Sequence, residues 1–154
     1  MIAQKKEWLI VLLLFGVSLF TRNYQLAKKP NGFFCDEASI GLNAYKLLTS
    51  GKDEYGKKWP IFFEAFGEYK NPIQIYSTIP IMAIFGPKVE SVRLVAGIWG
   101  SLGVVICYWL VAKTIDKKTG FLTAVMLMVL PWHWHLSRSA MEGMMAMVSL
   151  TFLG

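Results

Sequence analysis

Two adjacent carboxylates, Asp36 and Glu37, stand at the head of a helical pattern in the stretch NGFFCDEASIGLNAYKLL, residues 31–48. Aspartate is a favoured N-cap residue and glutamate is favoured in a first turn, because both meet unpaired N–H groups and the positive end of the helix dipole. Helix capping alone would explain why both carboxylates occur at this position. It would also keep a carboxylate ionised, as a general base or a metal ligand must be. The two roles are compatible.

Three cationic side chains stand close to apolar segments: Lys70 in GEYKNP, Arg93 in SVRL and Arg138 in HLSRSAMEG. Any one of them could simply extend its aliphatic stem toward lipid headgroups, which is common at helix ends. If all three face the carboxylates on one side of a membrane, they could instead clamp a phosphate through charge-assisted hydrogen bonds. Glu142, four residues after Arg138, could equally be its helical ion-pair partner.

The composition of the chain is that of a membrane protein. Of its 154 residues, 55% are hydrophobic and only 17% are charged. The apolar blocks at 8–20, 94–112 and 120–136 contain no Asp, Glu, Lys or Arg. A hydrocarbon core about 30 Å thick needs about 20 helical residues, a length that the second block meets and the others reach with their flanks. We therefore predict an all-α, polytopic membrane protein; its net charge of +6 fits anionic lipid rather than nucleic acid.

Positively charged flanks indicate which ends of these blocks face the cytoplasm. Lysines precede the first block, and three more occupy the short segment KTIDKKTG, residues 113–120. Both groups lie inside if the chain crosses outward, remains outside for a long loop, and returns before KTIDKKTG. The predicted membrane helices are about 8–27, 92–112 and 120–136, and the predicted outer loop is about 28–91.

Within the outer loop, a first interfacial helix is expected at 37–50. Its apolar residues recur at helical spacing, while Asn43 is expected to face away from them: Ile40, Ala44, Leu47 and Leu48. Gly51 is well placed to end this helix. From there to the next helix, the sequence predicts a polar loop.

A second interfacial helix is expected at 72–86, with Pro72 in its first turn. The segment is apolar, but it is short for a span and Pro80 interrupts it. Treating it as a span would also move the lysines of KTIDKKTG to the outside. A short true span remains the alternative.

Two further segments near the end of the chain have distinctive compositions. Trp132 and Trp134 alternate with His133 and His135, and histidines two apart on a helix point to different faces, so we interpret the cluster mainly as an aromatic belt. A fresh apolar run occupies 143–154 and is expected to be the start of another span. A helix ending within lipid would leave backbone groups unpaired, so we expect this chain to be the front piece of a longer protein.

Four stretches together resemble bacterial members of glycosyltransferase family 39, which are related to protein O-mannosyltransferases and lipid A aminoarabinose transferases in the GT-C superfamily. The stretches are FFCDEASIGLNAYKLLTSGKDEYGKKWP, FGEYKNPIQIYSTIPIMAIFG, SVRLVAG and PWHWHLSRSAMEG. The resemblance covers nearly the whole chain in the family's order. It implies a GT-C membrane module with two juxtamembrane helices in the first outer loop. Family members have roughly a dozen spans, so the chain would represent the N-terminal part.

The resemblance also implies roles for particular residues. The family's acidic pair falls on Asp36 and Glu37, with Asp36 as the expected catalytic base. Its phosphate-binding lysine falls on Lys70, although here Asn71 separates that lysine from the proline that often follows it. The donor phosphate is further expected to contact Arg93 and Arg138, with support from two neighbouring side chains: Tyr69 and Glu142.

The implied reaction transfers a sugar from a polyprenyl-phosphate donor to a hydroxyl of a protein, lipid or glycan acceptor at the outer face of the cell membrane. Direct attack would invert the anomeric centre. A divalent metal could bridge carboxylate and phosphate, but its ligands cannot be recognised in the sequence. Two other classes share these features: a non-catalytic protein that binds or transports polyprenyl-phosphate lipids, and an inactive scaffold fragment.

Overall fold

The computed structural model describes residues 2–141 and is mostly helical. The predicted segment at 143–154 lies outside the described residues. The elements are α1 (Ile2–Asn23), α2 (Cys35–Ser50), β1 (Phe63–Ala65), β2 (Glu68–Lys70), α3 (Pro72–Phe85), α4 (Val89–Thr114), α5 (Lys117–Val129) and α6 (Pro131–Leu136).

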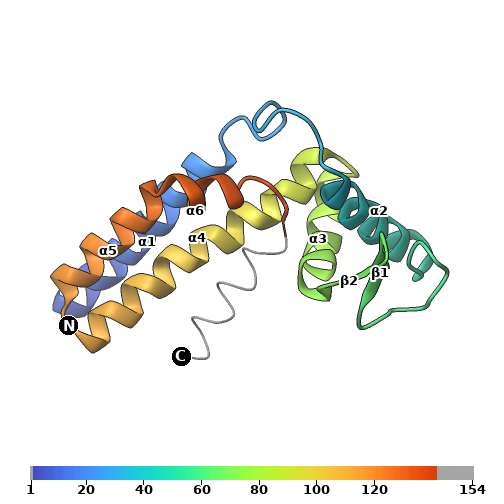
Figure 1. Cartoon of the computed structure of the whole chain (residues 1–154). Helices are drawn as coiled ribbons and strands as arrows, with labels where there is room; N and C mark the ends of the chain where they lie inside the picture. The colour runs from blue at the N-terminus through green and yellow to red at the C-terminus, as the bar shows by residue number, and fades with distance from the viewer. Residues whose placement is uncertain (1, 142–154) are drawn as a thin grey trace.

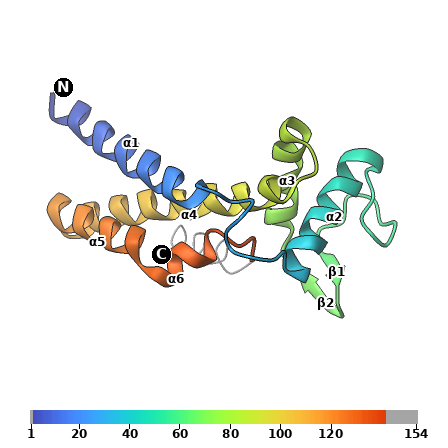
Figure 2. The ribbon, with the colours of Figure 1, turned by 90° about the horizontal axis from the view of Figure 1, so that it is seen from above.

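Three helices form one end of the molecule. Helix α4 packs against both α1 and α5, and the three lie side by side in Figure 1, while α2, α3 and the β-hairpin gather beyond the start of α4. The core between the three helices is apolar and buried: Val11, Leu14, Val104, Tyr108 and Ala124. The same separation into two regions is visible from above in Figure 2.

Only α4, among the helices described, is both long and apolar enough to cross a bilayer, with a mean hydropathy of 2.0 over its best window. The buried core helix of a soluble protein can have the same composition. In α1, the uncharged stretch runs only from Trp8 to Thr21, about 21 Å of helix. The predominantly helical fold is confirmed, whereas the number of membrane spans stays a prediction.

The segment 120–136 was expected to form one helix, but the structure has two helices there, because the helical backbone is interrupted at Leu130. Helix α5 ends at Val129, and Leu130 has an extended backbone with ψ of 118°. Pro131 then opens α6. A proline disfavours the helical conformation of the residue before it, which explains the break.

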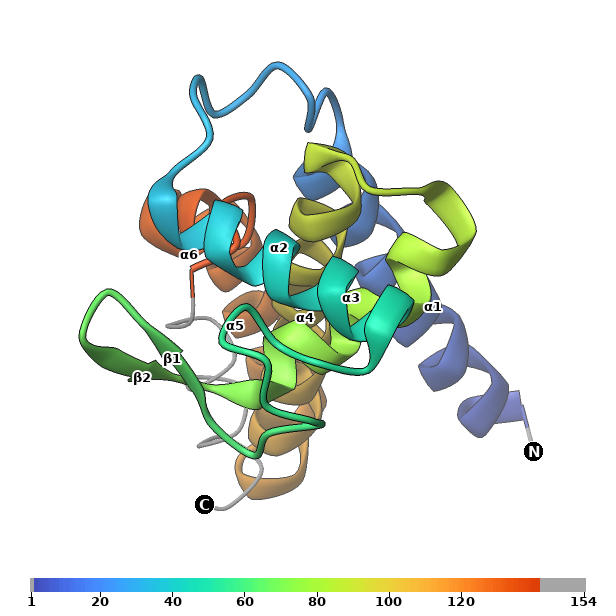
Figure 3. The ribbon, with the colours of Figure 1, turned by 90° about the vertical axis from the view of Figure 1, so that its right-hand side faces the viewer.

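Helix α2 packs against α3 at the far end of the molecule, as Figure 3 shows end-on. The expected end of α2 and the expected start of α3 are both present. Gly51 ends α2 with a left-handed backbone (φ 68°) and donates its N–H to the Leu47 carbonyl, and Pro72 opens α3. Ile40, Ala44 and Leu47 are buried as predicted, and Leu48 is 39% exposed.

The prediction that Asn43 faces away from the core is wrong. Its side chain is fully buried and makes three hydrogen bonds, two of which hold Glu54 in the loop after α2. The amide nitrogen donates to the Ser39 carbonyl (3.0 Å) and to Glu54 Oε1 (2.9 Å), and the amide oxygen accepts from the Glu54 N–H (3.0 Å). A polar side chain that ties down a loop has no signature in hydrophobic periodicity.

The β-hairpin was not predicted, since its segment was expected to be a polar loop. Strands β1 and β2 pair antiparallel, with Phe63 opposite Lys70 and Ala65 opposite Glu68. The two turn residues, Phe66 and Gly67, both have positive φ angles (53° and 81°), as tight hairpin turns require. The hairpin ends at Lys70, one of the predicted site residues.

Candidate functional site

The structure brings Asp36 and Lys70 into direct contact. Lys70 Nζ lies 2.6 Å from Asp36 Oδ1, and the two side chains are 10% and 44% exposed. The sequence suggested Asp36 as the N-cap of this helix, but Phe34 holds that position and the helix begins at Cys35. Asp36 therefore stands in the first turn with its carboxylate directed to Lys70 rather than to backbone N–H groups. It is accessible to a ligand.

Glu37 takes the capping role that the sequence offered to the pair, and it does more. Its side chain is fully buried. Oε2 accepts from the Phe34 N–H (3.1 Å), across the start of α2, and Oε1 accepts from the Ala140 N–H (3.0 Å), over a hundred residues away. Both oxygens also accept from Arg93. A carboxylate occupied in this way holds the fold and cannot take a proton from a substrate.

Arg93 is 1% exposed, and every N–H donor of its guanidinium is used. Nε and Nη2 donate to the two oxygens of Glu37, each at 2.9 Å. Nη1 donates to the carbonyls of Leu26 and Pro30, both at 3.0 Å, and Nη2 also donates to the Gly32 carbonyl. A guanidinium has five donors, so none is left for a phosphate in this arrangement. Neither snorkelling nor phosphate contact describes this residue.

Arg138 has a similar role at the end of α1. It is 3% exposed, and its guanidinium carbon lies 4.6 Å from the centre of the Trp134 ring. It donates to four carbonyls, through Nη1 to Thr21 (3.0 Å) and Arg22 (2.7 Å) and through Nη2 to Tyr24 (2.7 Å) and Lys29 (3.0 Å). The last carbonyls of a helix lack partners within it, and a cation there also complements the helix dipole.

The contacts of Glu37 predict a pH dependence of stability. Burial alone raises the pKa of Glu37, but hydrogen bonds from Arg93, Ala140 and Phe34 and the charge of Arg93 outweigh it and hold the pKa below 4.5. A carboxyl with a lowered folded-state pKa stabilises the fold above its unfolded pKa, and this contribution is lost as the pH falls through the folded value.

We therefore expect Glu37→Gln to be less stable than the wild type at pH 7, with the difference shrinking as the pH falls below about 4.5. Thermal unfolding followed by tryptophan fluorescence between pH 7 and pH 3 measures it. A difference that stays constant down to pH 3 would contradict an ionised Glu37 in the folded state.

An apolar hollow borders the Asp36 end of α2. It has a volume of about 310 Å³ and lies between α2 and the corner that joins α3 to α4. Phe33 and Ala38, on either side of the acidic pair, contribute to its lining, and Leu42 and Tyr45 continue it along α2. The ion pair does not contribute to this lining, because the lining residues of α2 lie on the opposite side of the helix from Asp36.

The remaining site predictions have different outcomes. Tyr69 is 70% exposed beside Lys70, and Phe66 places its ring centre 6.0 Å from Lys70 Nζ. Glu142 lies outside the described residues. Within residues 2–141, no group of three or more His, Cys, Asp or Glu side chains is arranged to hold a metal ion.

No family model, curated protein or solved structure matches this chain. The functional assignment therefore depends on the residues and their geometry.

A buried polar cluster of Ser18, Arg22 and His133 was not predicted from the sequence. Arg22 is fully buried; its Nη1 donates to Ser18 Oγ (2.6 Å), and its Nη2 lies 2.8 Å from His133 Nδ1. His133 is buried and His135 is exposed, so the two histidines do point to different faces. The spacing of Ser18 and Arg22, one helical turn apart, was the available signal. The cluster joins α1 to α6 and leaves no surface for a ligand.

Proposed function

We propose that this chain is the N-terminal part of a bacterial membrane glycosyltransferase of family 39, within the GT-C superfamily. It transfers a sugar from a polyprenyl-phosphate donor to an acceptor hydroxyl at the outer face of the cell membrane. The observation that carries the proposal is the direct contact between Lys70 and the half-exposed carboxylate of Asp36, beside a buried ion pair that begins one residue further along α2.

Exposed apolar side chains support the multi-pass part of the proposal. Four large residues on α1 are 58–69% exposed: Leu9, Leu12, Leu13 and Phe20. On α5, Leu122, Met126 and Val129 are 52–66% exposed. Apolar patches of this kind are unfavourable in water, and surrounding lipid would cover them. The uncharged stretch of α1 is shorter than the hydrocarbon core is thick. A membrane span is still compatible with it if the polar ends of the helix lie in the headgroup layers.

The proposed chemistry uses one base and one cation. The acceptor oxygen attacks the anomeric carbon, its proton passes to Asp36, and the bond from the anomeric carbon to the phosphate oxygen breaks. Polyprenyl phosphate leaves with the electron pair, and Lys70 stabilises the charge that develops on it. Attack opposite the leaving group inverts the anomeric centre.

The three predicted phosphate-binding cations have different roles in this proposal. Lys70 uses one of its three N–H donors for Asp36, so it can also bind a phosphate. Arg93 and Arg138 are engaged with backbone carbonyls and Glu37, and we assign both to positioning. Glu37 fixes the first turn of α2 and thereby the direction of Asp36.

A binding measurement tests the role of Lys70. Lys70→Ala in the complete protein should weaken binding of polyprenyl phosphate by roughly 10- to 100-fold, because a charge-assisted hydrogen bond to phosphate is lost. Titration of purified protein with a short-chain polyprenyl phosphate measures the affinity. Lys52→Ala, which removes an exposed lysine after α2, is the matched control and should bind normally. Equal affinity of wild type and Lys70→Ala would mean that Lys70 only pairs with Asp36.

A further inference from the structure

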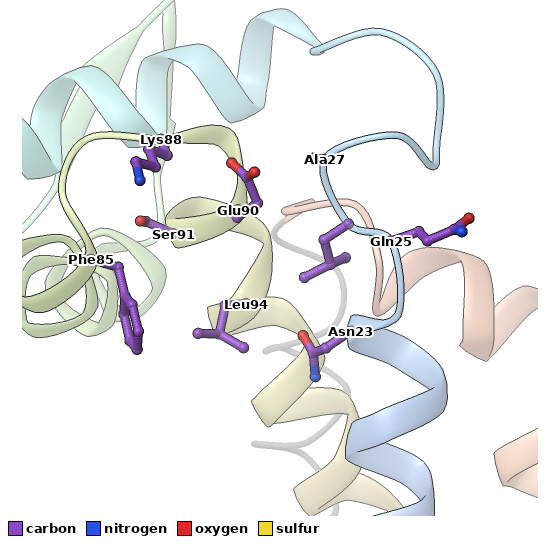
Figure 4. A pocket seen from close by; sticks show the side chains of 9 residues that line it. Asn23, Gln25, Ala27, Phe85, Lys88, Glu90, Ser91 and Leu94 are labelled. Atoms are coloured by element: carbon purple, nitrogen blue, oxygen red, sulfur yellow. The ribbon is translucent and has the colours of Figure 1, made fainter.

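A second hollow lies away from the acidic pair, on the other side of the α3–α4 corner. It has a volume of about 450 Å³ and is formed by the chain leaving α1, the end of α3 and the start of α4. Figure 4 shows the side chains that surround it: Asn23, Gln25, Leu26, Ala27, Phe85, Lys88, Glu90, Ser91 and Leu94. Neither Asp36 nor Lys70 contributes to its lining, and it shares only Lys88 with the groove beside α2.

The lower part of this hollow is apolar. Leu26 and Leu94 both line it. Phe85 borders it from the end of α3 and Leu94 from α4 (Figure 4). Phe85 and its neighbour Ile84 are 56% and 73% exposed, so the hollow continues onto an apolar surface. An acyl chain fits such a lining, because its transfer from water to apolar side chains is favourable.

The rim carries two opposite charges. Lys88 precedes α4 and Glu90 stands in its first turn, where the helix dipole favours an anion. Both side chains are exposed, and within the described residues neither makes a hydrogen bond or ion pair. Gln25 belongs to the opposite wall, but its amide points away from the hollow (Figure 4) and donates to the Tyr24 hydroxyl (3.3 Å).

This charge pattern selects among lipid headgroups. A zwitterion can place its phosphate at Lys88 and its cation at Glu90, whereas a purely anionic headgroup would face Glu90 with like charge. A primary ammonium can donate hydrogen bonds to Glu90, whereas a trimethylammonium group has no N–H to donate. The position also fits, since the hollow adjoins the first turn of α4, the helix best suited to cross a bilayer.

We propose that the hollow between the α1–α2 connection and the start of α4 binds a membrane phospholipid with a primary-amine headgroup, of the phosphatidylethanolamine type. Lys88 binds the phosphate, Glu90 binds the ammonium, and one acyl chain lies against Leu26 and Leu94. The inference rests on the proposed membrane location and is independent of sugar transfer.

Lipid competition tests this site without measuring activity. Purified complete protein, stripped of lipid, is offered an equimolar mixture of phosphatidylethanolamine, phosphatidylcholine and phosphatidylglycerol with identical acyl chains. Bound lipid is then counted by native mass spectrometry. We expect phosphatidylethanolamine to be enriched about tenfold over phosphatidylcholine, the factor for one charge-assisted hydrogen bond.

Two variants and a control locate the effect. Glu90→Gln should abolish the preference for the primary amine, and Leu94→Trp should lower retention of all three lipids by filling the hollow. Glu68→Gln removes an exposed carboxylate from the hairpin and should keep the preference. If Leu94→Trp does not fold, Glu90→Gln still decides. Equal binding of the three lipids, enrichment of phosphatidylglycerol, or an amine preference that persists in Glu90→Gln would overturn the assignment.

Discussion

Asp36→Asn is expected to lower the rate of sugar transfer by about 10²- to 10⁴-fold, the range that a positioned general base contributes. The amide keeps the shape of the side chain but cannot accept the proton of the acceptor hydroxyl. Because Asp36 is 44% exposed, losing its pairing with Lys70 should cost no more than about 1 kcal/mol of stability. The measurement is turnover of a lipid-phosphate sugar donor by the complete protein, alongside expression level and donor affinity.

Donor binding separates this result from loss of the fold. Asp36→Asn should retain donor affinity, because Lys70 then has no competing carboxylate. Glu64→Gln, an exposed hairpin carboxylate paired with Lys57, is the matched control and should turn over normally. Near-normal turnover by Asp36→Asn would remove the base assignment and favour a protein that binds or moves polyprenyl-phosphate lipids without chemistry.

Arg93→Ala is expected to be the most destabilising single change in the site, by about 3–5 kcal/mol. It leaves the carboxylate of Glu37 buried beside no cation and frees the carbonyls of Leu26, Pro30 and Gly32. Lysine at position 93 should recover only part of the loss, because a point charge cannot reproduce a planar fork with five donors. Denaturant titration followed by tryptophan fluorescence measures the free energy of unfolding.

A double variant shows whether the loss comes from the buried pair. Arg93→Met combined with Glu37→Leu should be less destabilised than the sum of the two single changes, because it leaves no unpaired charge. Lys113→Ala, at the other end of α4 and exposed, is the control and should change stability little. A loss below about 1 kcal/mol for Arg93→Ala, as for an exposed ion pair, would contradict the structural role of Arg93.

The parts of the fold that the sequence predicted have local causes. Gly51 and Pro72 act on their own backbone, so the end of α2 and the start of α3 could be placed without a structure. Hydrophobic periodicity likewise found the buried face of α2. The break at Leu130 also had a local signal in Pro131, but the apolar run across it concealed the break. Strands of three residues, such as β1, are too short to show alternation.

The roles of the site residues depended on contacts that no local pattern contains. Arg93 meets Glu37 across 56 residues, and Arg138 reaches the Thr21 carbonyl across 117. Most of their partners are backbone oxygens, which every residue carries, so residue type gives no indication of the pairing. Asp36 and Lys70 were expected on one face from the topology and the family resemblance. Nothing in the sequence indicated that Glu37 rather than Asp36 would cap the start of α2.

The connection between α1 and α2 is secured through its main chain. Arg138 and Arg93 bind carbonyl oxygens along it, from the last turn of α1 to Gly32, while side chains such as Lys28 and Lys29 point into solvent. A segment held in this way is indifferent to most of its side chains, so its course can persist while its composition drifts. Position 28 is therefore a suitable place to attach a spectroscopic label or an affinity handle close to the site without disturbing it.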